Sequence, residues 1–305
     1  MASTSSAQSY DGDPKNDAAL VYLNGEFVHR DKASVSVFDA GFVLGDGIWE
    51  GLRLVNGKLL SLDLHLDRLF EGAKAISLDI GLGRQEITDA ILATCETNGF
   101  TTDTHIRLMI SRGRKTTPNQ DPRFMASGAT IVIVAEIKRP RAQFAETGLT
   151  LFTSTFRCST PDVFDLHLNS HSRLNLIQAL IQAIAAGADE ALMLDHRGYV
   201  ASCNSTNFFI VRKGELWTSP GLYSFNGITR SHVSRLYGEQ IGPSMQKDFT
   251  LAQAYSADEA FVTGTLGGIT PVTRIDGHPI GDGTVGPKTR EAARAYWDWV
   301  RETCA

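Results

Sequence analysis

The chain has 305 residues, enough for about two domains, with 42% apolar and 21% charged residues. This composition is typical of folded globular proteins and excludes wholesale disorder. Lysine and arginine number 29 against 34 aspartate and glutamate, a net charge of −5 that gives no general nucleic-acid footprint. No apolar run approaches the ~20 residues of a membrane span. We therefore expect neither a nucleic-acid partner nor a membrane span.

The first 18 residues, MASTSSAQSYDGDPKNDA, contain no apolar core and no early positive charge. They do not resemble a signal peptide, and we predict a mobile polar tail over residues 1–18. The four cysteines are scattered without metal-ligand spacing, which predicts reduced thiols and a cytoplasmic location.

Ordered structure is expected from about Val21. Asn24-Gly25 and Asn56-Gly57 each lie between short apolar segments, a pattern that predicts hairpins. Ser61 is a suitable N-cap for a helix whose apolar residues keep helical spacing. The remaining predicted elements of this half are a helix over 84–98 and strands over 105–111 and 129–137.

The charged run Lys138-Arg139-Pro140-Arg141 interrupts the apolar pattern, and it predicts a linker between two domains rather than a surface turn within one. The predicted organisation is a small N-terminal domain over 19–138, a linker over 139–146 and a large C-terminal domain over 147–305. The later predicted elements are strands over 149–156, 190–194, 208–211 and 260–262 and helices over 172–186, 229–238 and 289–301. The mixed order predicts an α/β (α+β) fold without a regular βαβ series.

Two turns have the composition of anion sites. Residues 226–230 (NGITR) start a predicted helix, whose first N–H groups lie at the positive end of the helix dipole. Residues 263–271 (TGTLGGITP) offer three glycines and three threonines after a predicted strand. Arg68, within 65–69 (HLDRL), is a third candidate for a phosphate contact.

Together and in this order these segments resemble the fold-type IV pyridoxal-phosphate enzymes. Residues 38–50 (FDAGFVLGDGIWE) are similar to the opening signature of that family, and Gly113 and 187–192 (GADEAL) match further segments. The family includes branched-chain and D-amino-acid aminotransferases, R-selective amine transaminases and aminodeoxychorismate lyase. The resemblance covers about residues 20 to 300, and it implies a two-domain fold-type IV aminotransferase-like fold, a small-molecule substrate and a homodimer.

The resemblance also implies roles for individual residues. The phosphate of pyridoxal 5'-phosphate or pyridoxamine 5'-phosphate would contact four residues on the matching segments: Arg68, Ile228, Thr229 and Thr265. The substrate pocket would be lined by Trp49, Leu266 and Phe42. The basic loop after the strand at 105–111 supplies Arg114 or Lys115 as a residue that binds a substrate carboxylate.

Two positions depart from the family pattern. The lysine that forms the Schiff base in the family aligns with Asn169, and no lysine occurs between Lys138 and Lys213. The glutamate that keeps the pyridine nitrogen protonated aligns with Ser202, five residues before Asn207. An asparagine side chain forms no imine and has no titratable proton near neutral pH. A serine hydroxyl supplies no anion to the ring nitrogen.

Three interpretations follow. In the first, a class IV aminotransferase-like enzyme, a transferase or lyase, acts on a small amino or keto acid or amine with a non-covalently held cofactor. His167 or His171 would then move the proton, and His167 would share a strand face with Asn169. In the second, a cofactor-independent enzyme of lyase or hydrolase type reuses the pocket. In the third, the protein is a non-catalytic ligand binder.

Overall fold

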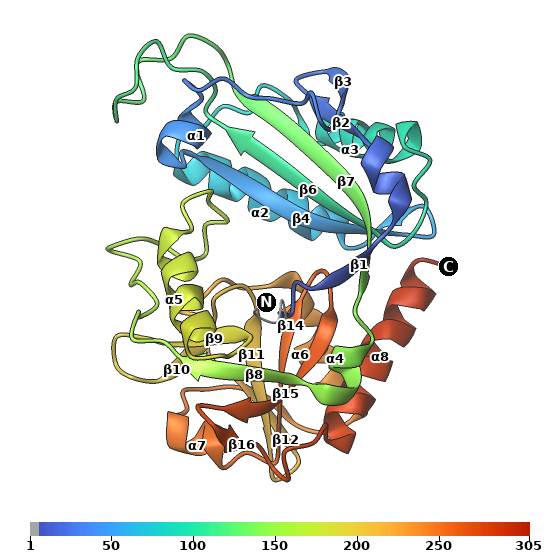
Figure 1. The fold of residues 1–305 in the computed structure, drawn as a ribbon, viewed down its shortest axis with the longest axis vertical. Coiled ribbons are helices and arrows are strands. Elements are labelled where there is room, and N and C mark those ends of the chain that lie inside the picture. Colours follow the sequence, from blue (N-terminus) through green and yellow to red (C-terminus); the bar gives the residue numbers. More distant parts are fainter. Residues whose placement is uncertain (1–5) are drawn as a thin grey trace. The chain divides into compact units, whose positions relative to one another are not determined.

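The computed structural model describes residues 6–305 and divides into two compact units. The N-terminal unit comprises Gly12–Arg139, Leu168–Arg173 and Cys304–Ala305. The C-terminal unit comprises Pro140–His167, Leu174–Thr303 and the described part of Met1–Asp11. Strand β1 (Tyr10–Gly12) lies where the chain passes from one unit into the other. Figure 1 labels the elements in chain order.

The N-terminal unit is built on a sheet with the strand order β3-β2-β7-β6-β4-β5. Strands β4 and β6 pair antiparallel from Gly47↔Ser111 to Leu54↔Thr104. The elements of this unit are η1 (Pro14–Ala18), β2 (Leu20–Leu23), β3 (Glu26–His29), α1 (Ala40–Leu44), β4 (Gly47–Val55), β5 (Lys58–Leu59), α2 (Leu62–Ala75), α3 (Arg84–Thr97), β6 (Thr104–Ser111) and β7 (Thr130–Pro140).

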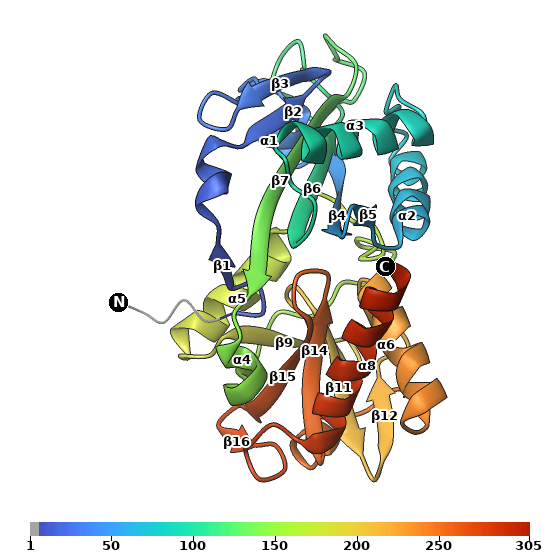
Figure 2. The same cartoon turned by 90° about the vertical axis from the view of Figure 1, so that its right-hand side faces the viewer.

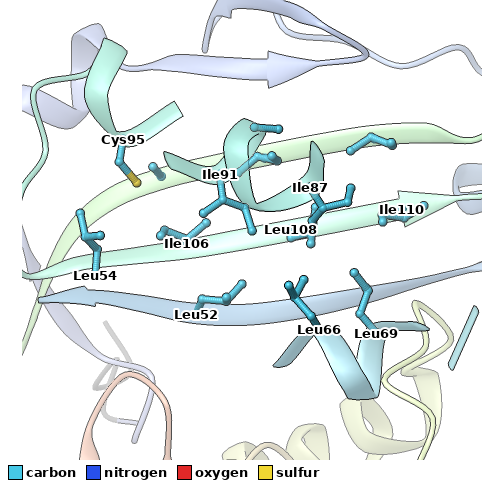
Figure 3. Packing of buried hydrophobic residues seen from close by; sticks show 14 of the residues in the cluster. Leu52, Leu54, Leu66, Leu69, Ile87, Ile91, Cys95, Ile106, Leu108 and Ile110 are labelled. Atoms are coloured by element: carbon cyan, nitrogen blue, oxygen red, sulfur yellow. The ribbon is translucent and has the colours of Figure 1, made fainter. Parts of the chain in front are cut away.

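Helices α2 and α3 cover one face of this sheet. Alternate residues of β4 and β6, such as Leu52 and Leu108, meet Leu69 of α2 and Ile91 of α3 in a closed apolar core (Figure 3). All four side chains are almost fully buried, and each contributes about 1.5–3 kcal/mol by leaving water. The other residues of β4 and β6 therefore have their side chains on the face that α2 and α3 do not cover.

The C-terminal unit contains a sheet with the strand order β10-β9-β8-β15-β14-β11-β12-β13, and β16 pairs with β15. Strand β8 is parallel to both neighbours, β9 and β15. The elements are α4 (Gln143–Thr147), β8 (Leu149–Thr153), α5 (Leu174–Ala185), β9 (Glu190–Leu194), β10 (Val200–Cys203), β11 (Asn207–Arg212), β12 (Glu215–Thr218), α6 (Ile228–Gln240), β13 (Ser244–Gln246), α7 (Leu251–Tyr255), β14 (Glu259–Gly264), β15 (Gly268–Ile275), β16 (His278–Pro279) and α8 (Pro287–Thr303).

Helices α6 and α8 pack side by side over β14 of this sheet (Figure 2). The start of α8 is fixed by Glu259 of β14, whose carboxylate accepts hydrogen bonds from the backbone N–H of Lys288 at 2.9 Å and of Thr289 at 2.6 Å. A carboxylate at this end satisfies two helix N–H groups and the positive end of the dipole. Gly286 makes the contact possible, because a Cβ there would lie 2.1 Å from Cδ of Glu259.

Within the polar tail expected over 1–18, residues 6–18 are described by the structure and have defined contacts. Residues 1–5 of that tail lie outside the described part of the chain. Ala7 is buried, and its backbone N–H donates to the buried carboxylate of Glu190 at 3.0 Å. Asn16 is buried as well, and its side chain exchanges two hydrogen bonds with the backbone of Ile137.

The expected linker over 139–146 is not a plain loop. Strand β7 continues to Pro140, and the short helix α4 begins at Gln143. The division into units changes between Arg139 and Pro140, at the start of the expected linker. All four cysteines are buried free thiols.

Candidate active site

Residues 168–173 extend the sheet of the N-terminal unit. Ser170 pairs with Ile48 of β4 in an antiparallel bridge. On either side of that bridge, the Trp49 N–H donates to the Asn169 carbonyl at 2.8 Å and the His171 N–H donates to the Gly47 carbonyl at 3.0 Å. Residues that face each other in such a pairing have their side chains on the same side of the sheet. Asn169 and His171 therefore lie on the same face as Trp49, opposite to the face that α2 and α3 cover.

The carboxamide of Asn169 is oriented by Arg173. A guanidinium only donates hydrogen bonds, so its partner on Asn169 is the oxygen Oδ1. The amide nitrogen Nδ2 consequently remains for another acceptor. Asn169 is buried, and its backbone is already fixed by Trp49. The residue at the position expected of the family lysine is thus a rigid hydrogen-bond donor.

The imidazole of His171 has a defined tautomer. Nε2 lies 2.9 Å from the carbonyl oxygen of Ile48, so Nε2 carries the proton and Nδ1 holds the lone pair when the ring is neutral. Burial lowers the pKa of His171 and outweighs the hydrogen bond to the Ile48 carbonyl, which raises it; among the nearby charges, Arg107 and Arg173 lower this pKa and Asp39 raises it. The ring is therefore neutral at pH 7.

Two glycines leave room at the lone-pair side of His171. A Cβ on Gly47 would lie 3.2 Å from Nδ1, and one on Gly41 would lie 3.4 Å from it. Side chains at either position would crowd this nitrogen.

Two arginines that the sequence pattern did not single out contact Trp49. Cζ of Arg107, on β6, lies 3.3 Å from the Trp49 ring centroid, and Cζ of Arg173 lies 5.3 Å from it. Gly51, which pairs with Arg107 across the strands, has no side chain to hinder this stacking. The available signal was the alternation of β6, which places His105, Arg107 and Met109 on one face.

Arg68 forms an ion pair with a buried carboxylate. Its Nε donates to Oε1 of Glu50 at 2.7 Å and its Nη2 donates to Oε2 at 2.7 Å. His65 also contacts Oε2 at 2.7 Å. Burial raises the pKa of Glu50, but the hydrogen bonds from Arg68 and His65 outweigh it and lower the pKa overall. The Arg68 guanidinium is therefore anchored from one side.

The two basic residues expected to bind substrate have different environments. Arg114 is exposed, and its backbone bridges to Asp39. Lys115 is buried, and its Nζ donates to the carbonyl of Asp121 at 2.9 Å, which stabilises its own loop. Nζ of Lys115 thus forms a structural contact within its own loop, whereas Arg114 is exposed at the surface.

Phe42 and Trp49, the two aromatic residues expected to line the substrate pocket, have different surroundings. Phe42, on the short helix α1, is 71% exposed, whereas Trp49 is half-buried beneath the two arginines. Of the two, Trp49 is the one that the structure places on the face with Asn169 and His171.

In the C-terminal unit, Asn207 links Ser202 to the start of α6. Its Nδ2 donates to the Phe225 carbonyl at 2.7 Å and to Oγ of Ser202 at 3.4 Å, and its Oδ1 accepts from the Gly227 N–H at 3.2 Å. The Ser202 hydroxyl itself donates to the Thr206 carbonyl at 2.8 Å. Ser202, five residues before Asn207, is thus a neutral group whose hydroxyl proton already forms a hydrogen bond.

The two predicted anion turns both lie in the C-terminal unit. Gly227 is the N-cap of α6 and has no side chain to occupy the first N–H groups of the helix, which belong to Ile228 and buried Thr229. The second turn connects β14 and β15, where half-buried Thr265 precedes buried Leu266.

The expectation that His167 shares a strand face with Asn169 is wrong. Residues 166–167 form a turn, and the pairing with β4 begins only at Asn169. His167 belongs to the C-terminal unit, where its Nδ1 lies 2.6 Å from Oδ1 of Asp165 and its side chain is 39% exposed. The structure places Asn169 and His171 together and His167 in the other unit.

The fold and these segments define the class of protein: the chain belongs to the class IV aminotransferase family, of fold type IV. The family described as "Amino-transferase class IV" matches residues 47–275. The resemblance identified from the sequence and the predicted fold class are therefore confirmed.

Individual relatives carry related names. The chain is 40% identical over 283 residues to branched-chain-amino-acid aminotransferase-like protein 1 of Arabidopsis thaliana, covering 93% of this chain and 51% of that protein. It thus spans about half the length of that relative. It is 38% identical over 279 residues to the putative branched-chain-amino-acid aminotransferase of Methanocaldococcus jannaschii, covering 91% of this chain and 95% of the relative.

Solved structures of this family have the same fold. A structure of the T.th. branched-chain amino acid aminotransferase with pyridoxamine 5'-phosphate has a TM-score of 0.85 at 30% identity, covering 93% of this chain and 94% of that chain. The branched-chain aminotransferase of Thermoproteus uzoniensis with norvaline has a TM-score of 0.81 at 31% identity, covering 92% of this chain and 94% of that chain.

Residues 6–305 contain neither a membrane-spanning helix nor a metal-binding cluster of side chains. No helix in this part of the chain is long and apolar enough to cross a membrane. The same residues contain no cluster of histidine, cysteine or acidic side chains arranged to hold a metal ion.

Proposed function

We propose that this protein is a class IV aminotransferase-like enzyme that acts on a small amino or keto compound and holds pyridoxal 5'-phosphate or pyridoxamine 5'-phosphate without a covalent bond. The observation that carries the proposal is the sequence around Asn169: this residue aligns by resemblance with the family lysine, and no lysine occurs between Lys138 and Lys213. Support for the cofactor comes from the T.th. relative with pyridoxamine 5'-phosphate and from the residues described below.

The residues present fit the phosphate of such a cofactor. The first turn of α6 has no side-chain cap, so the N–H groups of Ile228 and Thr229 are suited to bind an anion. Thr265 of the same unit adds a hydroxyl from the turn between β14 and β15. Arg68, in the N-terminal unit, is the guanidinium that the family resemblance assigns to the same phosphate. Backbone amides and hydroxyls of this kind match the chemistry of a phosphate dianion.

When bound, the cofactor supplies a reactive carbonyl or amine and an electron-withdrawing ring. Asn169 has no amine with which to tether that carbonyl, but its Nδ2 donates a hydrogen bond and orients an oxygen of the ligand. Ser202 contributes a neutral hydroxyl where the family pattern has an acid. At that position Ser202 would offer the ring nitrogen a hydroxyl but no anion to keep it protonated.

His171 is the residue we assign to proton transfer. Its Nδ1 holds the lone pair of the neutral ring, and the ring is fixed by the hydrogen bond from Nε2 to Ile48. It shares a sheet face with Asn169, so it can accept a proton from a group that Asn169 orients. His167 is the second candidate and is paired with Asp165.

The experiment is a spectral titration with pyridoxal 5'-phosphate, followed by borohydride reduction and peptide mapping by mass spectrometry. We expect saturable binding to the wild type, weakened by Thr229→Val, with no Thr229-dependent reduced adduct on a native lysine. Asn169→Lys is expected to form a covalent adduct on the new lysine. Gln178→Lys, at an exposed position of α5, is the matched control and is expected to form none.

The outcomes separate the three interpretations. An adduct on a native lysine that depends on Thr229 would contradict the proposal. Turnover of amino or keto acids without any cofactor binding would favour the cofactor-independent enzyme. Ligand binding without turnover would favour a binding protein.

We further propose a cytoplasmic homodimer. The stripe formed by Leu174, Ile177, Ile181 and Ile184 on α5 supports an interface, because each of these side chains is at least half exposed. Contiguous exposed apolar surface of this kind marks interaction sites. The buried free thiols are consistent with a reducing compartment.

A further inference from the structure

The first described residues of the chain, Ser6–Ser9, form a turn that we call the N-terminal turn. The Ser9 N–H donates to the Ser6 carbonyl at 2.9 Å, and the Gln8 N–H donates to Oγ of Ser6 at 3.0 Å. By its contacts this turn belongs to the C-terminal unit. Its second residue, Ala7, is buried in the apolar core of that unit.

The N-terminal turn is anchored on the carboxylate of Glu190, the first residue of β9. Glu190 is completely buried, and among residues 6–305 no basic side chain forms an ion pair with it. Its Oε1 accepts hydrogen bonds from the Ala7 N–H at 3.0 Å and from the Ser6 hydroxyl at 3.4 Å. Burial raises the pKa of Glu190, and hydrogen bonds from neutral donors oppose that rise. Because a buried charged acceptor is costly to leave unsatisfied, each of these donors matters.

The same carboxylate holds the turn between β10 and β11. The Thr206 hydroxyl donates to Oε2 of Glu190 at 2.9 Å, and the Ser205 hydroxyl donates to Oε1 at 3.3 Å. The carbonyl of Thr206 in turn accepts hydrogen bonds from the Ser202 hydroxyl at 2.8 Å and from the Cys203 N–H at 2.9 Å. Glu190 therefore connects the N-terminal turn to the segment that carries Ser202.

The N-terminal turn also lies against the turn between β14 and β15. A Cβ on Gly267 would lie 3.7 Å from the carbonyl oxygen of Ala7, and a Cβ on Gly264 would lie 3.5 Å from Cγ2 of Thr206. Thr265 lies between these two glycines in the sequence. A glycine backbone is permissive and does not fix its own conformation, so the shape of this turn depends on its neighbours.

We propose that the N-terminal turn positions the β10–β11 and β14–β15 turns, with Ala7 and Glu190 as positioning residues that do not touch the ligand. Docking of the N-terminal turn and binding of the cofactor strengthen each other, because both stabilise the same arrangement of these two turns. The coupling to the cofactor rests on the proposed function, whereas the positioning of the two turns does not.

The first test is hydrogen exchange of the ligand-free full chain, measured by mass spectrometry. Ala7→Pro removes the N–H that Glu190 accepts, and it preserves the N-terminal turn because proline suits the second position of a β-turn. We expect amides within residues 203–206 and 264–268 to exchange about fivefold faster or more, since local opening is no longer opposed by the N-terminal turn.

Ala142→Pro is the matched control. It makes the same substitution in the same unit, at the second position of a turn in which the Phe144 N–H donates to the Arg141 carbonyl at 3.2 Å. Ala142 is exposed, and its φ of −58° suits proline. We expect exchange in the β10–β11 and β14–β15 turns to match that of the wild type. Unchanged exchange in Ala7→Pro, or a uniform rise across the C-terminal unit, would overturn the proposal.

The second test is a calorimetric titration with pyridoxamine 5'-phosphate. Ala7→Pro is expected to weaken binding about fivefold or more, as a coupling between two sites typically does, and Ala142→Pro is expected to bind as the wild type does. Because coupling is reciprocal, saturating pyridoxamine 5'-phosphate is expected to slow exchange of the Ala7 N–H in the wild type. This last measurement needs no variant.

The two tests separate this inference from the proposed function. A wild type that binds no pyridoxamine 5'-phosphate, together with faster exchange of both turns in Ala7→Pro, would refute the proposed function and uphold the positioning role. Equal affinity of the wild type and Ala7→Pro, with no slowing of exchange at Ala7, would refute the coupling and leave the proposed function standing.

Discussion

Asn169 and His171 have complementary hydrogen-bonding capacities on one sheet face. Arg173 occupies the only acceptor of the Asn169 side chain, which leaves a donor, and Ile48 occupies the only donor of the neutral His171 ring, which leaves an acceptor. A donor and an acceptor two residues apart on one strand edge can act on the same small ligand. The pairing with β4 therefore determines the chemistry of both residues.

This arrangement predicts the pH dependence of turnover. A base acts only when neutral, and burial holds the pKa of His171 below its usual 6.5. We expect the rate to fall as pH decreases through that lowered pKa, so the midpoint of the acid limb lies below 6.5. His171→Gln is expected to reduce kcat about 100-fold and to remove that limb. The measurement is a pH–rate profile of both proteins.

His29→Gln is the control for this experiment, because His29 is a partly exposed histidine paired with Asp31. Its profile is expected to match that of the wild type. An acid limb that persists in His171→Gln would assign the proton transfer to another group, and His167 would be tested next.

The sequence predicts the chemical role of a single residue where flanking segments that match the family fix its alignment. Asn169 and Ser202 could be singled out because family segments flank both of them. Arg107 and Arg173 could not, since their importance depends on stacking against Trp49 from two separate segments. His167 was misplaced because a turn at 166–167 interrupts the expected strand, and a turn of this kind leaves no clear local signal.

The local pattern of apolar residues in the sequence predicts the helices and the long strands closely. The predicted helix over 84–98 matches α3 (Arg84–Thr97), and the predicted strand over 105–111 matches β6 (Thr104–Ser111). The helix expected from residue 172 begins instead at Leu174, because the preceding residues pair with β4. Contacts between distant segments decide such boundaries, and periodicity does not contain them.

The cap of α8 gives a prediction about stability. Gly286→Ala places a methyl group 2.1 Å from Cδ of Glu259, so the carboxylate must move away from the N–H groups of Lys288 and Thr289. We expect the variant to lose about 1–3 kcal/mol in the free energy of unfolding. The measurement is urea unfolding followed by tryptophan fluorescence.

Gly238→Ala is the matched control in the same unit. It lies within α6, and a Cβ there would make only an ordinary contact at 3.7 Å from Ser244. Alanine is favoured over glycine in a helix, so this variant is expected to gain about 0.5–1 kcal/mol. Equal effects of the two substitutions would contradict the role assigned to Gly286.

For the molecule as a whole, α5 presents an apolar surface that its own unit does not cover. Ala179 and Ala183 face the core of the unit, whereas Ile177 and Ile181 are half exposed. The helical spacing of the four large residues was recognisable in the sequence, but periodicity alone does not distinguish a core face from an interface. In the structure, the small residues Ala179 and Ala183 occupy the core face of α5, and the large apolar residues lie on the exposed face.

Ile181→Glu is expected to convert the protein from dimer to monomer, because a charge in the centre of an apolar contact is not solvated there. The measurement is light scattering coupled to size-exclusion chromatography. Glu239→Gln, at an exposed position of α6, is the control and is expected to remain dimeric. A wild-type protein that is monomeric at micromolar concentration would refute the dimer.

Because residues 168–173 are encoded far downstream of Arg139 and yet complete the first sheet, no continuous stretch of the gene specifies the N-terminal unit. A fragment that stops at Arg139 would leave the backbone N–H of Trp49 and the carbonyls of Gly47 and Ile48 without the bonds that they form with Asn169 and His171. Dissection of this protein by truncation would therefore yield an unsatisfied strand edge, and a loop-grafted hexapeptide would be needed to restore it.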